Sequence, residues 1–147
     1  MNTVKDLLKA KGSAVYTIAP SASVYEALAL MADKEIGALV VVSGERVQGI
    51  ISERDYARKV ILRGKFSKNT PVHEIMSPAD ITLQPTHTIE ECMALMTDKR
   101  LRHLPVLEDG KLVGIISIGD LVKSIIEEQK FTITNLENYI TGSPEVR

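Results

Sequence analysis

The chain has 147 residues, of which 44% are hydrophobic and 25% are charged, which suits one compact unit or two very small ones that fold together. A formal net charge of −1 argues against a general nucleic-acid-binding protein, which would carry an excess of basic residues. Cys92 is the single cysteine and the histidines show no close metal-ligand spacing, so neither an internal disulfide nor a metal site is expected. The N-terminal sequence lacks the apolar run of a signal peptide, and no apolar stretch approaches the ~20 residues of a membrane span. We therefore expect a cytoplasmic protein without a membrane segment.

The sequence repeats itself at a constant offset of 65 residues. The string GIISERD at residues 49–55 returns as GIISIGD at residues 114–120. The same offset relates Pro20 to Pro85 and Met31 to Met96. Two units of this length are too few and too long for a solenoid, so the repeat predicts a duplicated α/β half-domain whose two copies bury each other's apolar faces.

Each unit predicts the same elements in the same order. In the first unit they are a strand end at 15–18, a helix that opens with the S/T-x-x-E capping box at Ser23, strands at 37–42 and 47–52, and a helix at 54–63. In the second unit they are a strand end at 80–83, a helix after the capping box at Thr88, strands at 102–107 and 112–117, and a helix at 119–128. Both units are therefore predicted to be β-α-β-β-α.

The domain organisation follows from this repeat. Residues 1–62 form the first repeat, 63–71 a polar linker that ends in proline, and 72–128 the second repeat. Residues 129–147 are a C-terminal tail with an apolar stripe, which is compatible with a terminal helix. Such a stripe packs either on the chain's own core or on a neighbouring subunit, and the sequence leaves both open.

A β-α-β-β-α unit that occurs twice, with each copy carrying G-h-h-S-x-x-D (h is apolar), resembles a tandem pair of CBS domains, named after cystathionine β-synthase. The resemblance covers about residues 4–62 and 72–128. With the ending NLENYITG, the chain is similar to stand-alone CBS-pair proteins of bacteria and plant organelles. The resemblance implies an α/β fold in which the repeats pack sheet to sheet, with two clefts between them that bind adenosine-containing ligands. It also implies sensing of energy or redox state and no catalytic machinery.

The chemistry of an adenine nucleotide fits this motif. One carboxylate can accept hydrogen bonds from both ribose hydroxyls, which Asp55 and Asp120 can do from the first turn of a helix. A phosphate needs cations and free N–H donors, and adenine needs an apolar slot with backbone polar groups at its edge. The same S-x-x-D pattern is also a helix capping box that needs no ligand. Capping by the serine and ribose binding by the aspartate can coexist.

The resemblance implies that each cleft takes its S-x-x-D motif from one repeat and its adenine-facing backbone from the other. The first cleft would combine Ser117 and Asp120 with the backbone near Tyr16, Ile36, Gly37 and Ala38. The second would combine Ser52, Arg54 and Asp55 with the backbone near Ile81, Leu101, Arg102 and His103, and Arg58 would reach the same phosphate as Arg54.

The two copies differ between the serine and the aspartate. The first copy has Glu53 and Arg54 there, whereas the second has Ile118 and Gly119 and so no cation in its own loop. Arg102 and His103 lie near the middle of the pair and could project toward either phosphate. We expect clefts that are unequal in affinity or in ligand.

These features favour one of three classes of function. The leading hypothesis is a non-catalytic regulatory module that binds AMP, with ATP or NAD(H) as alternatives, and that signals to a protein partner by a conformational or assembly change, as a homodimer of CBS pairs. An enzyme is disfavoured, because the serine–aspartate pairs have no general base at a fixed local spacing and no P-loop or GxGxxG string is present. A ligand-free oligomerisation scaffold is the remaining alternative. No membrane or nucleic-acid partner is expected.

Overall fold

The computed structural model describes residues 3–12 and 14–141. The first unit contains β1 (Thr17–Ile18), α2 (Val24–Lys34), β2 (Ala38–Ser43), β3 (Arg46–Ser52) and α3 (Glu53–Lys59). The second contains β4 (Ser77–Pro78), α4 (Ile89–Lys99), β5 (His103–Glu108), β6 (Lys111–Ser117) and α5 (Ile118–Thr141). Helix α1 (Val4–Lys11) precedes both units, and short 3₁₀ turns lie at Ile61–Arg63, Ser67–Asn69 and Val72–Glu74.

The predicted order of elements is confirmed with two differences. The strand expected at 80–83 is reduced to a single parallel bridge between Leu83 and Val106. The helix expected at 54–63 ends at Lys59, because the φ of Val60 is −119° although its N–H still donates to Tyr56 O, and the chain continues into a 3₁₀ turn. Helix α1 and strand β4, which pairs with β3, are additional elements that the repeat pattern does not predict.

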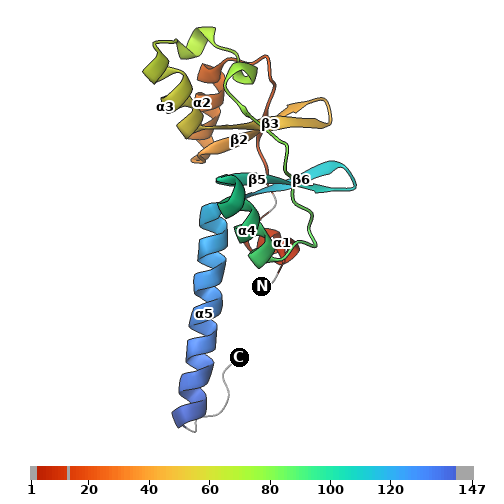
Figure 1. The fold of residues 1–147 in the computed structure, drawn as a ribbon, viewed down its shortest axis with the longest axis vertical. Coiled ribbons are helices and arrows are strands. Elements are labelled where there is room, and N and C mark those ends of the chain that lie inside the picture. Colours follow the sequence, from red (N-terminus) through yellow and green to blue (C-terminus); the bar gives the residue numbers. More distant parts are fainter. Residues whose placement is uncertain (1–2, 13, 142–147) are drawn as a thin grey trace.

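Two sheets lie in the middle of the folded body, with helices on their outer sides (Figure 1). One sheet has the order β1-β2-β3-β4, and the other contains the hairpin β5-β6. Both hairpins carry a β-bulge at the equivalent place, between Val41 and Val42 and between Val106 and Leu107. Helices α2 and α3 cover the first sheet, while α1 and α4 cover the second (Figure 1). The α/β fold of two repeats packed sheet to sheet is confirmed.

The first residues of each repeat, 3–12 in the first and 72–78 in the second, are exchanged segments, because each packs on the core of the other repeat. Val4, Leu7 and Leu8 of α1 are buried in the second core, beside Ile89 and Met96 of α4. In the same way Val72 and Ile75 are buried in the first core, among α2, β2 and β3. Backbone hydrogen bonds fix this exchange at both places, since the N–H of Val4 donates to His87 O at 2.9 Å and that of Val72 donates to Ala22 O at 2.8 Å. Residues 1–62 and 72–128 therefore each contribute side chains to both cores.

The first residue of each G-h-h-S-x-x-D motif is glycine because the exchanged segments pass directly over it. A Cβ at Gly49 would lie 2.4 Å from the backbone oxygen of Ser77, which belongs to β4. A Cβ at Gly114 would lie 2.7 Å from Cδ2 of Leu8 in α1. Both distances are shorter than any ordinary contact, so a side chain at either position would push the exchanged segment away from its sheet.

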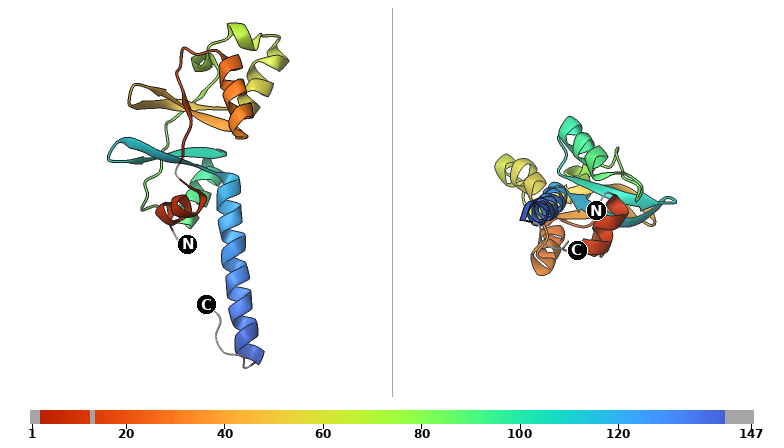
Figure 2. Two further views of the ribbon diagram at one scale, coloured as in Figure 1. Left: turned by 180° about the vertical axis from the view of Figure 1, so that it is seen from behind. Right: turned by 90° about the horizontal axis from the view of Figure 1, so that it is seen from below.

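Helix α5 has 24 residues and extends well beyond the folded body, as both side views show (Figures 1 and 2). Its first turns are anchored in the second core by Leu121, which is fully buried. The predicted boundary between the second repeat and the tail at residue 129 falls inside this helix, and residues 142–147 of the predicted tail lie outside the described residues. Within the described part of the chain, no helix is both long and apolar enough to cross a membrane.

We expect Gly49→Ala to lower the free energy of unfolding by roughly 1–3 kcal/mol, because the new methyl group meets backbone that cannot rotate away. Gly114→Ala should cost less, since the flexible end of Leu8 can move. Gly119→Ala is the matched control, because its Cβ would meet Ser117 Oγ at an ordinary 3.6 Å. Urea denaturation followed by circular dichroism measures all three, and equal stability of the Gly49 and Gly119 variants would contradict the packing argument.

Candidate functional site: two clefts between the repeats

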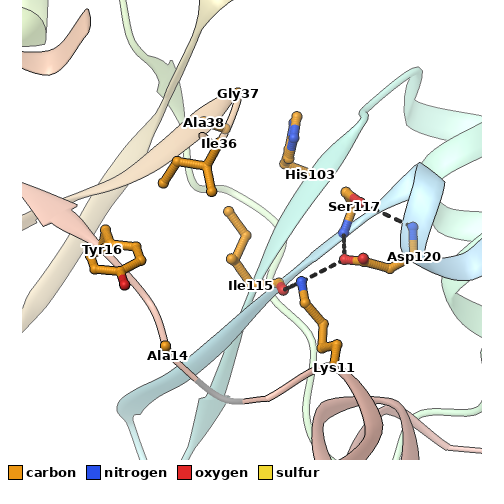
Figure 3. A pocket seen from close by; sticks show the side chains of 10 residues that line it. All are labelled: Lys11, Ala14, Tyr16, Ile36, Gly37, Ala38, His103, Ile115, Ser117 and Asp120. Atoms are coloured by element: carbon orange, nitrogen blue, oxygen red, sulfur yellow. Dashed lines mark hydrogen bonds and ion pairs between the residues drawn. The ribbon is translucent and has the colours of Figure 1, made fainter. Parts of the chain in front are cut away.

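The first cleft is a cavity of about 270 Å³ whose walls come from both repeats (Figure 3). The start of β2 contributes Ile36, Gly37 and Ala38, and the junction of β6 with α5 contributes Ser117 and Asp120. Tyr16, just before β1, closes one side, so all the residues expected at this cleft are brought together. His103, which was expected to reach either phosphate, lines this cleft as well, and three further lining residues were not suggested by the sequence: Lys11, Ala14 and Ile115.

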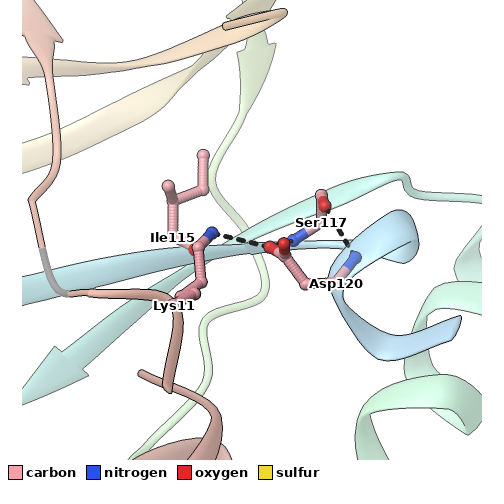
Figure 4. A network of polar contacts seen from close by, with 4 residues as sticks. All are labelled: Lys11, Ile115, Ser117 and Asp120. Atoms are coloured by element: carbon pink, nitrogen blue, oxygen red, sulfur yellow. Dashed lines mark hydrogen bonds and ion pairs between the residues drawn. The ribbon is translucent and has the colours of Figure 1, made fainter. Parts of the chain in front are cut away.

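Lys11 is the most consequential of these additional residues. Its Nζ donates to Asp120 Oδ2 at 2.6 Å and to the backbone oxygen of Ile115 at 3.0 Å (Figure 4). The N–H of Ser117 also donates to Asp120 Oδ2, at 2.9 Å, and Ser117 Oγ accepts from the N–H of Asp120 at 3.0 Å. The contacts to this carboxylate within the described residues thus all use Oδ2, which leaves Oδ1 available to a ligand.

The charge of Asp120 is held in place by these neighbours. Partial burial opposes its ionisation, but the hydrogen bonds from Lys11 and from the Ser117 N–H outweigh that effect and keep the pKa of Asp120 below its usual range. The second repeat indeed has no cation in its own loop, as the sequence indicates, yet α1 supplies one from 109 residues away. Only the packing of α1 on the second core brings this lysine to the cleft.

The second cleft is a cavity of about 290 Å³ at the equivalent place in the other half of the molecule. Of the residues expected there, it is lined by Ser52, Arg54, Asp55, Arg58, Leu101, Arg102 and His103. Lys59 and Arg100 are additional cations, and Ile50 and Ser77 complete the wall. Ile81 lies instead in an adjoining cavity of about 270 Å³, which shares Ile50, Ser77, Leu101 and His103 with the cleft. The expected residues therefore line two adjoining cavities here rather than one.

Asp55 is more completely engaged than Asp120. Its Oδ2 accepts from the N–H of Ser52 at 2.9 Å, and its Oδ1 lies 3.2 Å from Nζ of Lys59, one turn further along α3. Lys59 also donates to the backbone oxygen of Ile75 at 3.0 Å, so it joins α3 to the exchanged segment. The side chain of Asp55 is 12% exposed, against 23% for Asp120. A ribose in the second cleft would have to compete with Lys59, whereas the first cleft offers a free carboxylate oxygen.

Backbone N–H donors at the two helix starts are largely used within the protein. The N–H of Glu53 donates to Gly37 O at 3.1 Å, and that of Ile118 donates to Arg102 O at 2.8 Å. The N–H groups of Asp55 and Asp120 donate to their capping serines. A phosphate in either cleft would therefore depend mainly on side-chain cations rather than on the helix N-terminus.

His103 lines both clefts, the first together with Lys11 and Asp120 and the second together with Arg102 and Asp55. Burial lowers the pKa of its imidazole below the usual value, and the nearby lysine and arginine add to this, while the two aspartates oppose it. His103 is therefore neutral at pH 7 and can act as a hydrogen-bond partner for a ligand in either cleft. No group of three or more potential metal ligands occurs among residues 3–12 and 14–141.

We expect Lys11→Met to destabilise the protein at pH 7 by less than about 1 kcal/mol, because the ion pair is partly exposed. The stabilisation from a carboxyl group with a lowered pKa is present above its unfolded pKa of about 4 and is lost as the pH falls through the lower folded value. The stability difference from the parent protein should therefore shrink as the pH is lowered from 7 to 3. Melting curves across this range measure it, with Lys9→Met on the same helix as the control, and a difference that is constant with pH would contradict the assignment.

Comparison with known proteins gives the same architecture. The profile of the CBS domain matches residues 4–62 and 72–127. A solved structure from Burkholderia ambifaria MC40-6, of a protein with CBS domains assigned to signal transduction, is 54% identical, covers 86% of this chain and 96% of its own, and superimposes with a TM-score of 0.82. The mitochondrial CBS domain-containing protein CBSX3 of Arabidopsis thaliana is 40% identical over an alignment of 149 positions, which covers 95% of this chain and 72% of CBSX3.

A more distant structure shows how such pairs assemble elsewhere. The hexameric CBS-CP12 protein of bloom-forming cyanobacteria is 26% identical, with 95% of this chain and 85% of that one covered and a TM-score of 0.76. Tandem CBS domains are regulatory, non-catalytic modules that generally bind ligands. The matches at both repeats, together with two clefts that share His103 in their walls, show that this chain belongs to the CBS domain family as a tandem pair.

Proposed function

We propose that this protein is a regulatory module that binds adenosine nucleotides in the two clefts between its repeats, with AMP as the first choice. The observation that carries the proposal is the first cleft, in which Asp120 lies across a cavity from the small residues Gly37 and Ala38. A carboxylate oxygen available for ribose hydroxyls, opposite a slot narrow enough for a purine, is what an adenosine ligand needs. The cleft joins both repeats, so a ligand there would stabilise one arrangement of them over another.

The charge of the first cleft favours a nucleotide with a single phosphate. Lys11 and Asp120 form an ion pair, and the neutral His103 adds no charge. Lys11 Nζ donates two of its three hydrogens within the protein, to Asp120 and Ile115, so one remains for a phosphate oxygen. AMP fits these groups better than ATP does, while ATP and NAD(H) remain alternatives for the protein as a whole.

Occupancy of the first cleft would act directly on α5. Asp120 caps the first turn of this helix, and it is also the residue that would hold the ribose. A ligand that binds one arrangement of the repeats more tightly shifts the population toward it, and this shift would reach the exposed part of α5 through its N-terminus. The protein partner that receives the signal is expected but not identified, and the predicted cytoplasmic location stays a prediction, since the Arabidopsis relative is named as mitochondrial.

We expect AMP at 100 times its dissociation constant to raise the melting temperature by about 5–10 °C, which corresponds to about 2.7 kcal/mol. Asp120→Ala should abolish most of this rise, and Asp55→Ala should affect only binding at the second cleft. A thermal-shift panel with AMP, ADP, ATP, NAD and NADH measures these effects.

Loss of a helix cap by itself would also lower the stability, so matched cap variants are needed as controls. Glu26→Ala and Glu91→Ala remove the same capping contact from α2 and α4, and neither glutamate lines a cleft. Both controls should melt lower but keep the full AMP response. If nucleotide-free protein responds to none of the adenosine ligands, the ligand-free scaffold is the better account.

We further propose that α5 pairs with α5 of a second copy, which gives the expected homodimer. Five of its seven large exposed apolar residues follow heptad spacing with alternating steps of four and three, with Gln129 at the remaining position, whereas Phe131 and Tyr139 lie off this pattern: the five are Val122, Ile126, Ile133, Leu136 and Ile140. Heptad spacing of this kind is typical of helices that pair in a coiled coil. Lys130 and Glu137 flank the stripe at equivalent heptad positions, so an antiparallel pair would place them opposite each other twice.

We expect Ile133→Asp to convert a dimer into a monomer, because it buries a charge in the centre of the paired helices. Thr134→Asp, on the exposed side of the same turn, is the control and should leave the dimer intact. Size-exclusion chromatography with light scattering measures the mass of each. A parent protein that is monomeric, or an Ile133 variant with an unchanged mass, would exclude this surface as the dimer interface.

A further inference from the structure

The second cleft contains a cluster of arginines that the first cleft lacks. Arg54 and Arg58 come from α3, and Arg100 and Arg102 come from the connection between α4 and β5. At the 65-residue offset, Arg102 takes the place of Gly37. The two clefts therefore share one backbone plan but offer very different charges.

None of these four arginines forms an ion pair with a carboxylate in the described part of the chain. The ion pairs found there involve lysines, and the one carboxylate that lines this cleft, Asp55, is already paired with Lys59. Arg54, Arg58 and Arg102 line one cavity, and repulsion from Arg58 and then Arg102 lowers the pKa of the Arg54 guanidinium, against a smaller opposing attraction from Asp55. A cluster of like charges that repel one another is a site whose field favours an anion of high charge.

The shape of the second cleft also favours a longer ligand. The adjoining cavity has a mostly apolar wall that includes Ile81, Leu101 and Leu104, and it meets the arginine-lined cavity at His103. A purine in the apolar part would place its phosphate chain toward the arginines. Ribose would contribute less here than in the first cleft, because both oxygens of Asp55 are already engaged.

We propose that the second cleft is selective for ligands with two or more adjacent phosphate groups, such as a nucleoside diphosphate or triphosphate, and that it binds AMP weakly. This inference rests on the proposed function. It assigns ribose binding mainly to the first cleft and phosphate binding mainly to the second. Guanidinium groups suit the second site because their planar donors make paired, charge-assisted hydrogen bonds to phosphate oxygens. The chemistry recognised is the phosphate chain, which a nucleotide or a free inorganic polyphosphate could supply.

Isothermal titration of the full chain with AMP, ADP, ATP and inorganic tripolyphosphate tests the proposal. Each of Arg54→Gln and Arg102→Gln should weaken ATP binding about tenfold and AMP binding by less than about threefold. Arg46→Gln is the control, because Arg46 lies at the end of β3 opposite to Ser52 and does not line this cleft. Asp120→Ala should weaken the binding of AMP and leave the binding of tripolyphosphate unchanged. ATP binding at the second cleft should weaken steeply with added salt.

The outcomes separate this inference from the proposed function. Binding of tripolyphosphate that depends on Arg54 and Arg102 supports the phosphate site even if no adenosine ligand binds. If ATP binds more tightly than tripolyphosphate, a nucleotide is the source of the phosphate chain. Binding of AMP that depends on Asp120, without any preference for ATP or any effect of the arginine variants, would overturn the inference and leave the proposed function intact.

Discussion

The fold depends on one packing constraint, the passage of each exchanged segment over a glycine in the other repeat. Each exchanged segment lies against the sheet of the other repeat at one glycine. Leu8 packs over Gly114, and Ser77 lies beside Gly49. Each repeat thereby completes the apolar core of its partner, so the half-domains need each other to bury their hydrophobic side chains. Because the exchange ties the two sheets face to face, the clefts form at the seam between the repeats.

The S-x-x-D motif has a structural role as well as the proposed functional one. At both α3 and α5 the serine and the aspartate exchange hydrogen bonds as a cap, which places a buried or partly buried carboxylate beside a cavity. A lysine compensates each of these charges and also donates to a backbone oxygen of the protein. The two lysines come from unrelated positions, Lys59 from the same helix as its aspartate and Lys11 from α1. The need for a counter-ion is therefore met in each half, but by a different element.

The duplication preserves the backbone and varies the chemistry. Both hairpins keep the same bulge and both helix starts keep the same cap, whereas Gly37 is replaced by Arg102 and Ala38 by His103. Small residues leave room for a ligand in one cleft, and arginines raise the positive charge of the other. His103 lies between the two, so a ligand in either cleft would contact a side chain that the other cleft shares. That shared wall gives the clefts a physical route by which they could influence each other.

Local signals in the sequence were sufficient for the elements and for most of the site. Capping boxes at Ser23 and Thr88 and alternation in the strands depend on neighbours along the chain, and the repeat itself indicated which elements are equivalent. The weak strand at 80–83 was overpredicted, because a strand exists only through its partner and Leu83 finds just one bridge. Lys11, the adjoining cavity at Ile81 and the exchange of α1 could not be read from the sequence, since each depends on which residues distant in the chain meet. The sequence by itself determined the duplicated fold and the motif, whereas the tertiary structure alone decided which charges face each cleft, because an electrostatic field depends on distances in space rather than along the chain.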